Sequence, residues 1–351
     1  MHRTTAAGAL ATAFAFAVAA PLAAAQDQAA LFAGRTVTIV VGYPPGGGFD
    51  LAARMLVQHM GRFIPGNPNL IAQNMPGASS FKASNYVYNV VPKDGTFLGA
   101  LDSTIPLAQK LTGQGRFEPE KFYWIGRLAA DDSVGLSWHT SGIRTIEDAR
   151  KKEVAMSAGG AMGPASMIGH ALNRVAGTKF KMILGYRGSS PMVAAMEQGE
   201  VGAAGTYGFT ALKTLKKDWL DNKRVNLLYV VSYERNPEIP DVPALPELGR
   251  TELDKKVLRM ITARSVVGRS YVAPPGVDAA RGAALRKAFD AMVTDKGFLA
   301  DMKKRNFLVS PATGDQISKV VADVVNADAA LVERTRWATA PDKGAAKAKT
   351  K

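Results

Sequence analysis

The sequence lacks cysteine entirely among its 351 residues. This absence excludes disulfide bonds, thiol nucleophiles, cysteine zinc sites and iron–sulfur clusters, so packing alone must stabilise the fold. Only four histidines occur. Three of them, His59, His139 and His170, are scattered without the spacing of metal ligands. We therefore expect no metal and no cofactor.

Beyond its first residues, the sequence also lacks the run of about 20 apolar residues that spans a bilayer. At the start, His2 and Arg3 precede an apolar, alanine-rich segment, residues 6–20, and small residues that end at Ala25. This order is typical of a signal peptide. We expect residues 1–25 to be a signal peptide that is cleaved near Ala25, which predicts a periplasmic protein.

Lysine and arginine outnumber the acidic residues, and the formal net charge is +14. The basic residues form only short clusters, such as residues 216–217 and 303–305, and no aromatic residues alternate with them as they would in a nucleic-acid platform. We interpret the charge as a bias toward acidic ligands and expect no nucleic-acid partner. The composition of residues 338–351 predicts that they form a disordered basic tail.

The sequence pattern alternates β-branched apolar runs with segments of helical periodicity, and short Gly, Pro or Ser loops join them. This alternation predicts an α/β fold with mostly parallel sheets. In the first half the expected elements are strands at 36–41, 69–74 and 96–101 and helices at 49–63 and 82–90. In the middle they are helices at 146–152, 164–176 and 191–198 and strands at 154–156, 182–184, 201–204 and 226–231.

Two segments, residues 122–138 and 259–273, are expected to be extended and to cross between two such α/β units. Two helices, at 278–295 and 315–334, then close the fold. The expected architecture is a hinged periplasmic-binding-protein (Venus flytrap) fold, with two lobes joined by two crossing strands around a ligand cleft. The lobes would comprise residues 26–135 with 259–337, and residues 136–258.

The loops that follow the strands are the candidate ligand site. In parallel sheets, ligands bind beyond the carboxyl ends of the strands, where glycine permits close approach and helix N-termini favour carboxylates. Residues 43–50 are the strongest candidate. They lack the Gly-Lys-Ser/Thr of a phosphate-binding loop and the glycine spacing of a dinucleotide fingerprint.

Individual side chains in these loops leave alternatives open. Arg187 is suited to grip a carboxylate in bidentate fashion or to lie in a surface turn. Asp50 is interpreted as a helix cap rather than a ligand contact. Asp102 is suited to accept a bond from a ligand hydroxyl or amine, or is an exposed loop carboxylate. Tyr43 and Tyr207 pack against a ligand or against the core.

Several ordered segments resemble the Bug (TctC-like) family, the periplasmic receptors of tripartite tricarboxylate transporters. They are residues 42–50, 73–78, 92–96, 186–188, 239–243 and 272–277. The resemblance implies a flytrap fold, non-covalent capture of a small organic acid, and delivery to membrane permease subunits. We expect a monomer without enzymatic activity.

The resemblance also implies the ligand-binding positions. They are Tyr43, Gly46, Gly47, Gly48, Phe49, Asp50, Asp102, Ser103, Ser157, Gly159, Gly160, Ser166, Tyr186, Arg187, Gly188, Thr206 and Tyr207. Three departures put the ligand in doubt. The second-lobe loop, residues 157–166, is longer than is usual in the family. Met167 stands where many relatives have histidine, and residues 202–207 lack the acidic positions common there.

Other functions and ligands stay open at this point. The same fold serves a sensor or scaffold that presents its closed form to a signalling partner. A secreted hydrolase is disfavoured, because the sequence has no Gly-x-Ser-x-Gly elbow and no His-Glu-x-x-His helix. Dicarboxylates, tricarboxylates, aromatic acids and amide-bearing compounds all remain candidate ligands.

Overall fold

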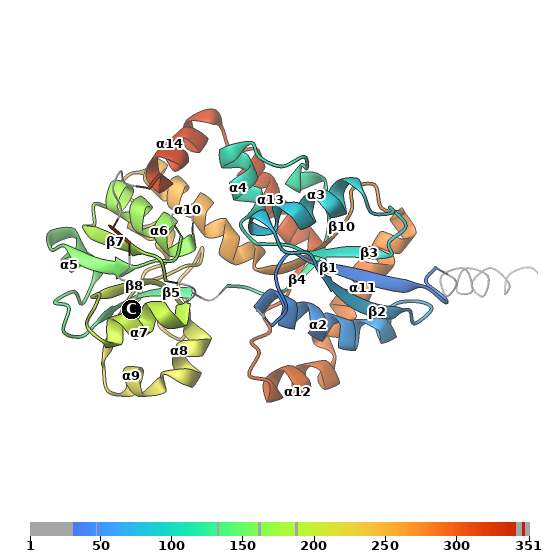
Figure 1. The fold of residues 1–351 in the computed structure, drawn as a ribbon, viewed down its shortest axis with the longest axis horizontal. Helices are drawn as coiled ribbons and strands as arrows, with labels where there is room; N and C mark the ends of the chain where they lie inside the picture. The colour runs from blue at the N-terminus through green and yellow to red at the C-terminus, as the bar shows by residue number, and fades with distance from the viewer. Residues whose placement is uncertain are drawn as a thin grey trace, which may run out of the picture.

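The computed structural model describes residues 31–46, 48–131, 133–160, 163–186, 189–341 and 346–347. They form two lobes, each with a central sheet that has helices on both faces (Figure 1). The expected signal peptide and most of the expected basic tail lie outside these residues. Within the described part, no helix combines the length and the apolar character needed to cross a membrane.

The sheet of the first lobe has the strand order β2-β1-β3-β10-β4-β11. Strands β1, β2 and β3 are parallel, whereas β10 runs antiparallel to β3 and β4, and β11 runs antiparallel to β4. The strands are Thr36–Val41 (β1), Asn69–Asn74 (β2), Phe97–Ala100 (β3), Tyr123–Ala129 (β4), Arg269–Ala273 (β10) and Ala312–Thr313 (β11).

The sheet of the second lobe repeats this plan, with the order β12-β7-β6-β8-β5-β9. Strands β6, β7 and β8 are parallel, β12 adds parallel to β7, and β5 runs antiparallel to β8 and β9. The strands are Ser133–Trp138 (β5), Val154–Ser157 (β6), Phe180–Leu184 (β7), Ala203–Gly208 (β8), Val225–Val230 (β9) and Ala346–Lys347 (β12). The predicted α/β class and its repeated topology are therefore confirmed.

Helices cover both sheets and link the lobes. In the first lobe they are Gly48–Met60 (α2), Phe81–Asn89 (α3), Ile105–Thr112 (α4), Ala279–Thr294 (α11), Lys296–Lys304 (α12) and Gly314–Val325 (α13). In the second lobe they are Ile146–Lys151 (α5), Pro164–Ala171 (α6), Ser189–Glu197 (α7), Phe209–Leu215 (α8) and Lys217–Asp221 (α9). Glu252–Val267 (α10) and Ala329–Thr339 (α14) contact both lobes. The short 3₁₀ and π turns are Gly61–Phe63, Ala78–Ser80, Pro119–Lys121, Leu172–Ala176 and Leu245–Leu248.

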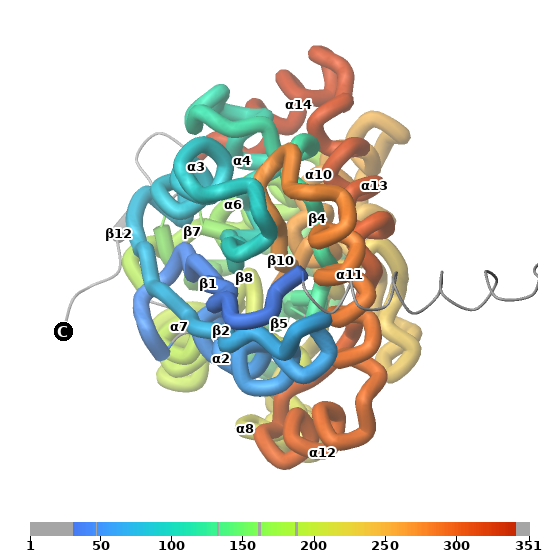
Figure 2. The backbone as a smooth tube through the Cα atoms, turned by 90° about the vertical axis from the view of Figure 1, so that its right-hand side faces the viewer, coloured from blue at the N-terminus to red at the C-terminus, as the bar shows by residue number. Residues whose placement is uncertain are grey.

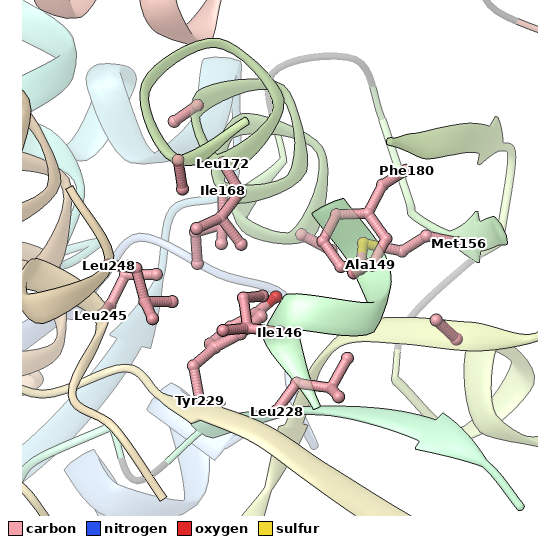
Figure 3. Packing of buried hydrophobic residues seen from close by; sticks show 14 of the residues in the cluster. Ile146, Ala149, Met156, Ile168, Leu172, Phe180, Leu228, Tyr229, Leu245 and Leu248 are labelled. Atoms are coloured by element: carbon pink, nitrogen blue, oxygen red, sulfur yellow. The ribbon is translucent and has the colours of Figure 1, made fainter. Parts of the chain in front are cut away.

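Each lobe has its own apolar core. In the second lobe, Ile168 and Leu172 pack together with Met156, Phe180 and other residues of the cluster shown in Figure 3. Burial of such side chains contributes roughly 1.5–3 kcal/mol each. Because the chain has no disulfides, these two cores carry the stability of the lobes.

The second crossing differs from the prediction. Residues 252–267 form helix α10, and only β10 is extended. The Thr251 hydroxyl caps this helix by accepting a hydrogen bond from the Asp254 N–H at 3.1 Å. Because α10 lies between the lobes, it is buried around most of its circumference. The amphipathic pattern that identifies a surface helix is therefore missing from its sequence.

Other helices were also mispredicted. The expected helix at 315–334 is two helices, α13 and α14, because Asp328 begins a new helix by accepting a hydrogen bond from the Leu331 N–H at 2.8 Å. The sequence interpretation missed α4, α8, α9 and α12, which are only five to nine residues long. Segments this short carry little periodic signal.

The chain passes between the lobes three times rather than twice. It crosses between β4 and β5, along α10, and from α13 to α14. An interlobe cluster joins α4, α6, α10, α13 and α14. Its buried members are Leu107, Leu111, Met167, Met260, Ala263, Val324 and Val332. Figure 2 shows α14 at one end of the molecule and α8 and α12 at the opposite end.

Gly135 gives a test of core packing in the second lobe. It lies opposite Tyr229 on the neighbouring strand, and a Cβ at this position would meet the Tyr229 ring at 2.1 Å. The ring is held in place because its hydroxyl donates to the Gly205 carbonyl at 2.8 Å. We expect Gly135→Ala to lower the free energy of unfolding by about 1–3 kcal/mol in urea titrations.

The control is Gly160→Ala, since no described atom lies within 4 Å of a Cβ at Gly160. We expect this variant to unfold within about 0.5 kcal/mol of the wild type. Equal stability of the two variants would contradict the packing described for Tyr229.

Candidate functional site

A cleft of about 480 Å³ lies between the lobes and is called the inner cleft here. The first lobe lines it with Tyr43, Phe49, Ser79, Asp102, Ser103 and Thr104. The second lobe contributes Gly160, Gly163 and Pro164, and the crossing segments contribute Asp131, Arg264, Gly268 and Arg269. These residues lie at the carboxyl ends of strands or in the crossing segments, where ligands of open α/β sheets bind.

Three helices begin at the inner cleft. Phe49 lies in the first turn of α2, Thr104 precedes α4, and Gly163 precedes α6. Each helix N-terminus carries about half a positive charge and unpaired N–H groups. The partial charges of these three helices favour an anion at the inner cleft.

Two arginines and two aspartates line the inner cleft. Arg264 is paired with Asp131, with its Nη2 atom 2.7 Å from Asp131 Oδ2. In contrast, Arg269 forms no ion pair with a carboxylate of the described residues, and its Nη1 donates a long hydrogen bond of 3.5 Å to the Ala130 carbonyl. Arg269 is thus a cation in the cleft that acts on Asp131 through its charge but has no ion-pair partner in the described part of the chain.

The two carboxylates differ in their pKa. Burial acts to raise the pKa of Asp131, but the charges of Arg264 and Arg269 and a 2.5 Å hydrogen bond from Ser133 outweigh it and lower the pKa. Burial also raises the pKa of Asp102, and here it prevails over the hydrogen bonds from Thr104. Asp131 is therefore firmly ionised, whereas the charge of Asp102 is destabilised.

A left-handed turn presents Ser79 to the inner cleft. Ala78, Ser79 and Ser80 have φ values of 46°, 50° and 73°, a conformation that costs non-glycine residues of order 1–3 kcal/mol each. The Ser80 hydroxyl holds the turn by accepting a hydrogen bond from the Asp102 N–H at 3.2 Å. It packs so closely on Gly42 that a Cβ there would lie 1.8 Å from Ser80 Oγ. Such strain is concentrated at ligand-binding sites.

A second cavity of about 680 Å³, called the outer chamber here, shares Asp131 and Arg269 with the inner cleft. Its walls come from α8 of the second lobe and from the segment after α12 of the first lobe. Ser189, Thr206, Thr210 and other hydroxyl residues line it. Arg269 therefore lies where the two cavities meet.

Comparison with known proteins gives the family. The model of the tripartite tricarboxylate transporter family receptor matches residues 70–336, more than half of the chain. The chain belongs to this receptor family. A curated relative from Cupriavidus necator, the UPF0065 protein in gbd 5'region, is 25% identical to the receptor over 327 residues, which cover 90% of this chain and 92% of the relative.

Solved structures show the same two-lobed fold. A TctC solute-binding protein from Polaromonas, without ligand, has a TM-score of 0.66 at 21% identity and covers 86% of the receptor and 98% of its own chain. A protein from R. palustris solved with adipate has a TM-score of 0.59 at 18% identity and covers 90% of the receptor and 99% of its own chain. The family and these structures are solute-binding proteins.

The structure brings seven of the implied site residues of the receptor to the two cavities. Five line the inner cleft: Tyr43, Phe49, Asp102, Ser103 and Gly160. The rings of Tyr43 and Phe49 stack, with centroids 4.7 Å apart and an interplanar angle of 16°. Thr206 and Tyr207 line the outer chamber instead, and Tyr207 also belongs to the core of the second lobe.

Asp50 stabilises the glycine loop and does not line either cavity. Its buried carboxylate accepts hydrogen bonds from the Gly46 N–H at 2.8 Å, Arg54 Nε at 2.9 Å and Asn74 Nδ2 at 2.8 Å. Instead of the expected helix cap, the Asp50 side chain therefore forms hydrogen bonds that link the glycine loop, α2 and β2. Gly48 leaves room for Arg269, since a Cβ there would lie 3.4 Å from Arg269 Nη2.

The implied residues of the second lobe lie mostly behind the cleft wall. Ser157 is buried, and its hydroxyl lies 3.1 Å from the Met192 carbonyl oxygen. Ser166 is also fully buried. The Gly159 carbonyl accepts a hydrogen bond from Gly185. Tyr186 packs against the core, and burial raises its pKa to about 12.

Gly47, Arg187 and Gly188 lie outside the described residues, so their ligand contacts stay predictions. Met167, where relatives have histidine, belongs to the buried interlobe cluster. An apolar side chain at this position fits that environment.

Sequence reasoning missed Asp131, Arg264 and Arg269. It assigned residues 259–273 to one extended crossing, so it did not bring the two arginines together beside Asp131. The available signal was their location, because a segment that crosses between two lobes must pass the cleft. Within the described residues, no cluster of three or more potential metal ligands occurs.

The lowered pKa of the Asp50 carboxyl predicts that the stability of the fold depends on pH. The hydrogen bond from Arg54, with those from Gly46 and Asn74, outweighs burial and lowers the pKa of Asp50 from 3.8 to about 2. A lowered carboxyl pKa stabilises the fold above the unfolded-state value, and this contribution is lost as the pH falls toward 2. We expect Asp50→Asn to cost about 2 kcal/mol in urea unfolding at pH 7.

The difference between the variant and the wild type should narrow between pH 4 and pH 2. The control is Asp221→Asn, which removes an exposed ion pair with Lys217 and should change stability by less than about 0.5 kcal/mol. An Asp50→Asn penalty that is the same at low pH would show that the carboxylate charge is not what stabilises the loop.

Proposed function

We propose that this receptor captures a small organic anion non-covalently, with a ligand carboxylate at Arg269, and delivers it to the membrane permease subunits of a tripartite tricarboxylate transporter. Residues 1–25 would direct its export to the periplasm. The two lobes, each built on one of the two sheets, would close around the ligand. The receptor would act as a monomer without catalytic turnover.

The observation that carries this proposal is the guanidinium of Arg269, which forms no ion pair with any carboxylate of the described residues. It lines both the inner cleft and the outer chamber, and Gly48, at the N-terminus of α2, lies next to it. A guanidinium offers fixed donors that match a carboxylate, and a helix N-terminus adds N–H groups and partial positive charge. Together they form a binding position for one carboxylate.

The walls around Arg269 favour closure on a ligand. The first lobe contributes Asp102 and Ser103 and the second lobe contributes Gly160 and Gly163, so a bound molecule contacts both lobes at once. Binding energy gained from both walls stabilises the closed form over the open form. A permease that recognises the closed form would then receive loaded receptor.

The proposal is tested by a thermal-shift screen of organic acids followed by calorimetry. A ligand that binds only the folded state raises the melting temperature. With the best ligand, we expect Arg269→Gln to weaken binding about 10- to 100-fold, since a charge-assisted hydrogen bond contributes about 1.5–3 kcal/mol. The melting temperature without ligand checks that the variant folds.

The matched control is Arg305→Gln in the outer chamber. The guanidinium of Arg305 is already bound by both carboxylate oxygens of Asp301 at 3.0 Å, so its loss should change the dissociation constant by less than about threefold. Arg269→Gln with wild-type affinity would reject Arg269 as the anchor. A screen in which no organic acid shifts the melting temperature would reject the carboxylate receptor.

A further inference from the structure

The charges of the inner cleft limit the charge of the ligand. The described lining holds two cations, Arg264 and Arg269, and two carboxylates, Asp102 and Asp131. The 2.7 Å ion pair with Asp131 compensates the charge of Arg264. Arg269 is then the one cation in this lining that is left for a ligand, and it can neutralise one carboxylate.

A second ligand carboxylate would find no such partner in the described part of the inner cleft. Its nearest ionisable wall residue outside the Arg264–Asp131 pair would be Asp102, and like charges brought together out of water repel strongly. The N-terminus of α4 does not compensate, because Asp102 Oδ1 already accepts the Thr104 N–H at 2.6 Å. The partial charges of α2 and α6 remain to support the first carboxylate.

The outer chamber does not supply the missing cation either. Its further arginine, Arg305, is bound by Asp301, and its other described lining residues are neutral except for the shared Asp131 and Arg269. Among the residues that the structure describes, at least one charge of a dicarboxylate or tricarboxylate would therefore find no free cation in either cavity.

One carboxylate oxygen of Asp102 is available to accept a hydrogen bond from a ligand. The Thr104 N–H and hydroxyl bind one carboxylate oxygen, Oδ1. The other oxygen, Oδ2, accepts no hydrogen bond from any described residue, and the half-buried side chain lines the inner cleft. This oxygen can therefore accept a hydrogen bond from a ligand that enters the inner cleft.

We infer that this receptor selects a monocarboxylate that also carries a hydrogen-bond donor, an amide or an ammonium group, and discriminates against dicarboxylates and tricarboxylates of the same size. Arg269 binds the carboxylate and Asp102 accepts from the donor. This inference rests on the proposed function, since it names the ligand class of the same cleft. Asp102 is the specificity-determining residue, because it attracts the donor and repels a second carboxylate.

The test uses pairs of ligands that differ only in one terminal group. Succinate, glutarate and adipate are compared with succinamate, glutaramate and adipamate, in which an amide replaces one carboxylate. We expect the wild type to bind the best-fitting monoamide at least about tenfold more tightly than the diacid of equal length. Calorimetry at pH 7.5 gives both dissociation constants.

The variant Asp102→Asn should abolish this preference. It keeps an oxygen that can accept from Thr104 but removes the negative charge and adds a donor. We expect the ratio of diacid to monoamide dissociation constants to fall at least about fivefold, mainly because the diacid binds better. The control is Asp290→Asn, an exposed position outside both cavities, where the ratio should stay as in the wild type.

The outcomes separate the two proposals. If diacids bind the wild type as tightly as their monoamides, or more tightly, the ligand class inferred here is wrong while carboxylate capture stands. An unchanged ratio in a folded Asp102→Asn variant removes Asp102 as its determinant. If Asp102→Asn does not fold, the wild-type ratios alone decide the ligand class. Absence of binding by every carboxylate tested overturns the proposed function and this inference with it.

Discussion

The passage of helix α10 between the lobes is the constraint on which the rest of the structure depends. The helix packs against the second lobe through residues such as Val257 and against the first lobe through Val267. Its buried faces also form part of the interlobe cluster. Because the helix and the strand after it are fixed in this way, Arg264 and Arg269 are held at the cleft, within the same short crossing.

Around this crossing, the two sheets direct their strand ends toward each other (Figure 1). The loops after β1, β3 and β6 therefore meet at one place, although the first and the last of them are more than a hundred residues apart in the sequence. Glycine loops and helix N-termini make that place attractive to anions. The ion pair between Arg264 and Asp131 leaves Arg269 as the proposed anchor of the ligand and Asp102 as the proposed selecting group.

Much of this architecture could be predicted from the sequence. Strand β1 is a continuous β-branched run that Gly42 ends, and β2 has an apolar centre, residues 70–72, and is followed by Pro76. The predicted bounds of both strands agree with the structure. Five residues of the inner cleft were predicted because they follow strands, and ligands bind beyond the carboxyl ends of strands in parallel sheets. They are Tyr43, Phe49, Asp102, Ser103 and Gly160.

The rest required three-dimensional information. Helix α10 is buried on most sides, which removes its periodic pattern. Asp50 and Ser157 looked like site residues because they belong to the right loops, yet their side chains bind the protein itself. Whether a loop side chain points into a cleft or behind it depends on packing, which a single sequence does not encode in local patterns.

The central claim is that Arg269 anchors the ligand between the lobes. The most direct measurement is a crystal structure of the receptor with its best-binding carboxylate from the thermal-shift screen. The account predicts a ligand carboxylate within about 3.2 Å of the Arg269 guanidinium, with atoms of both lobes around it. A ligand carboxylate held elsewhere, with Arg269 facing solvent or paired to a protein carboxylate, would contradict it.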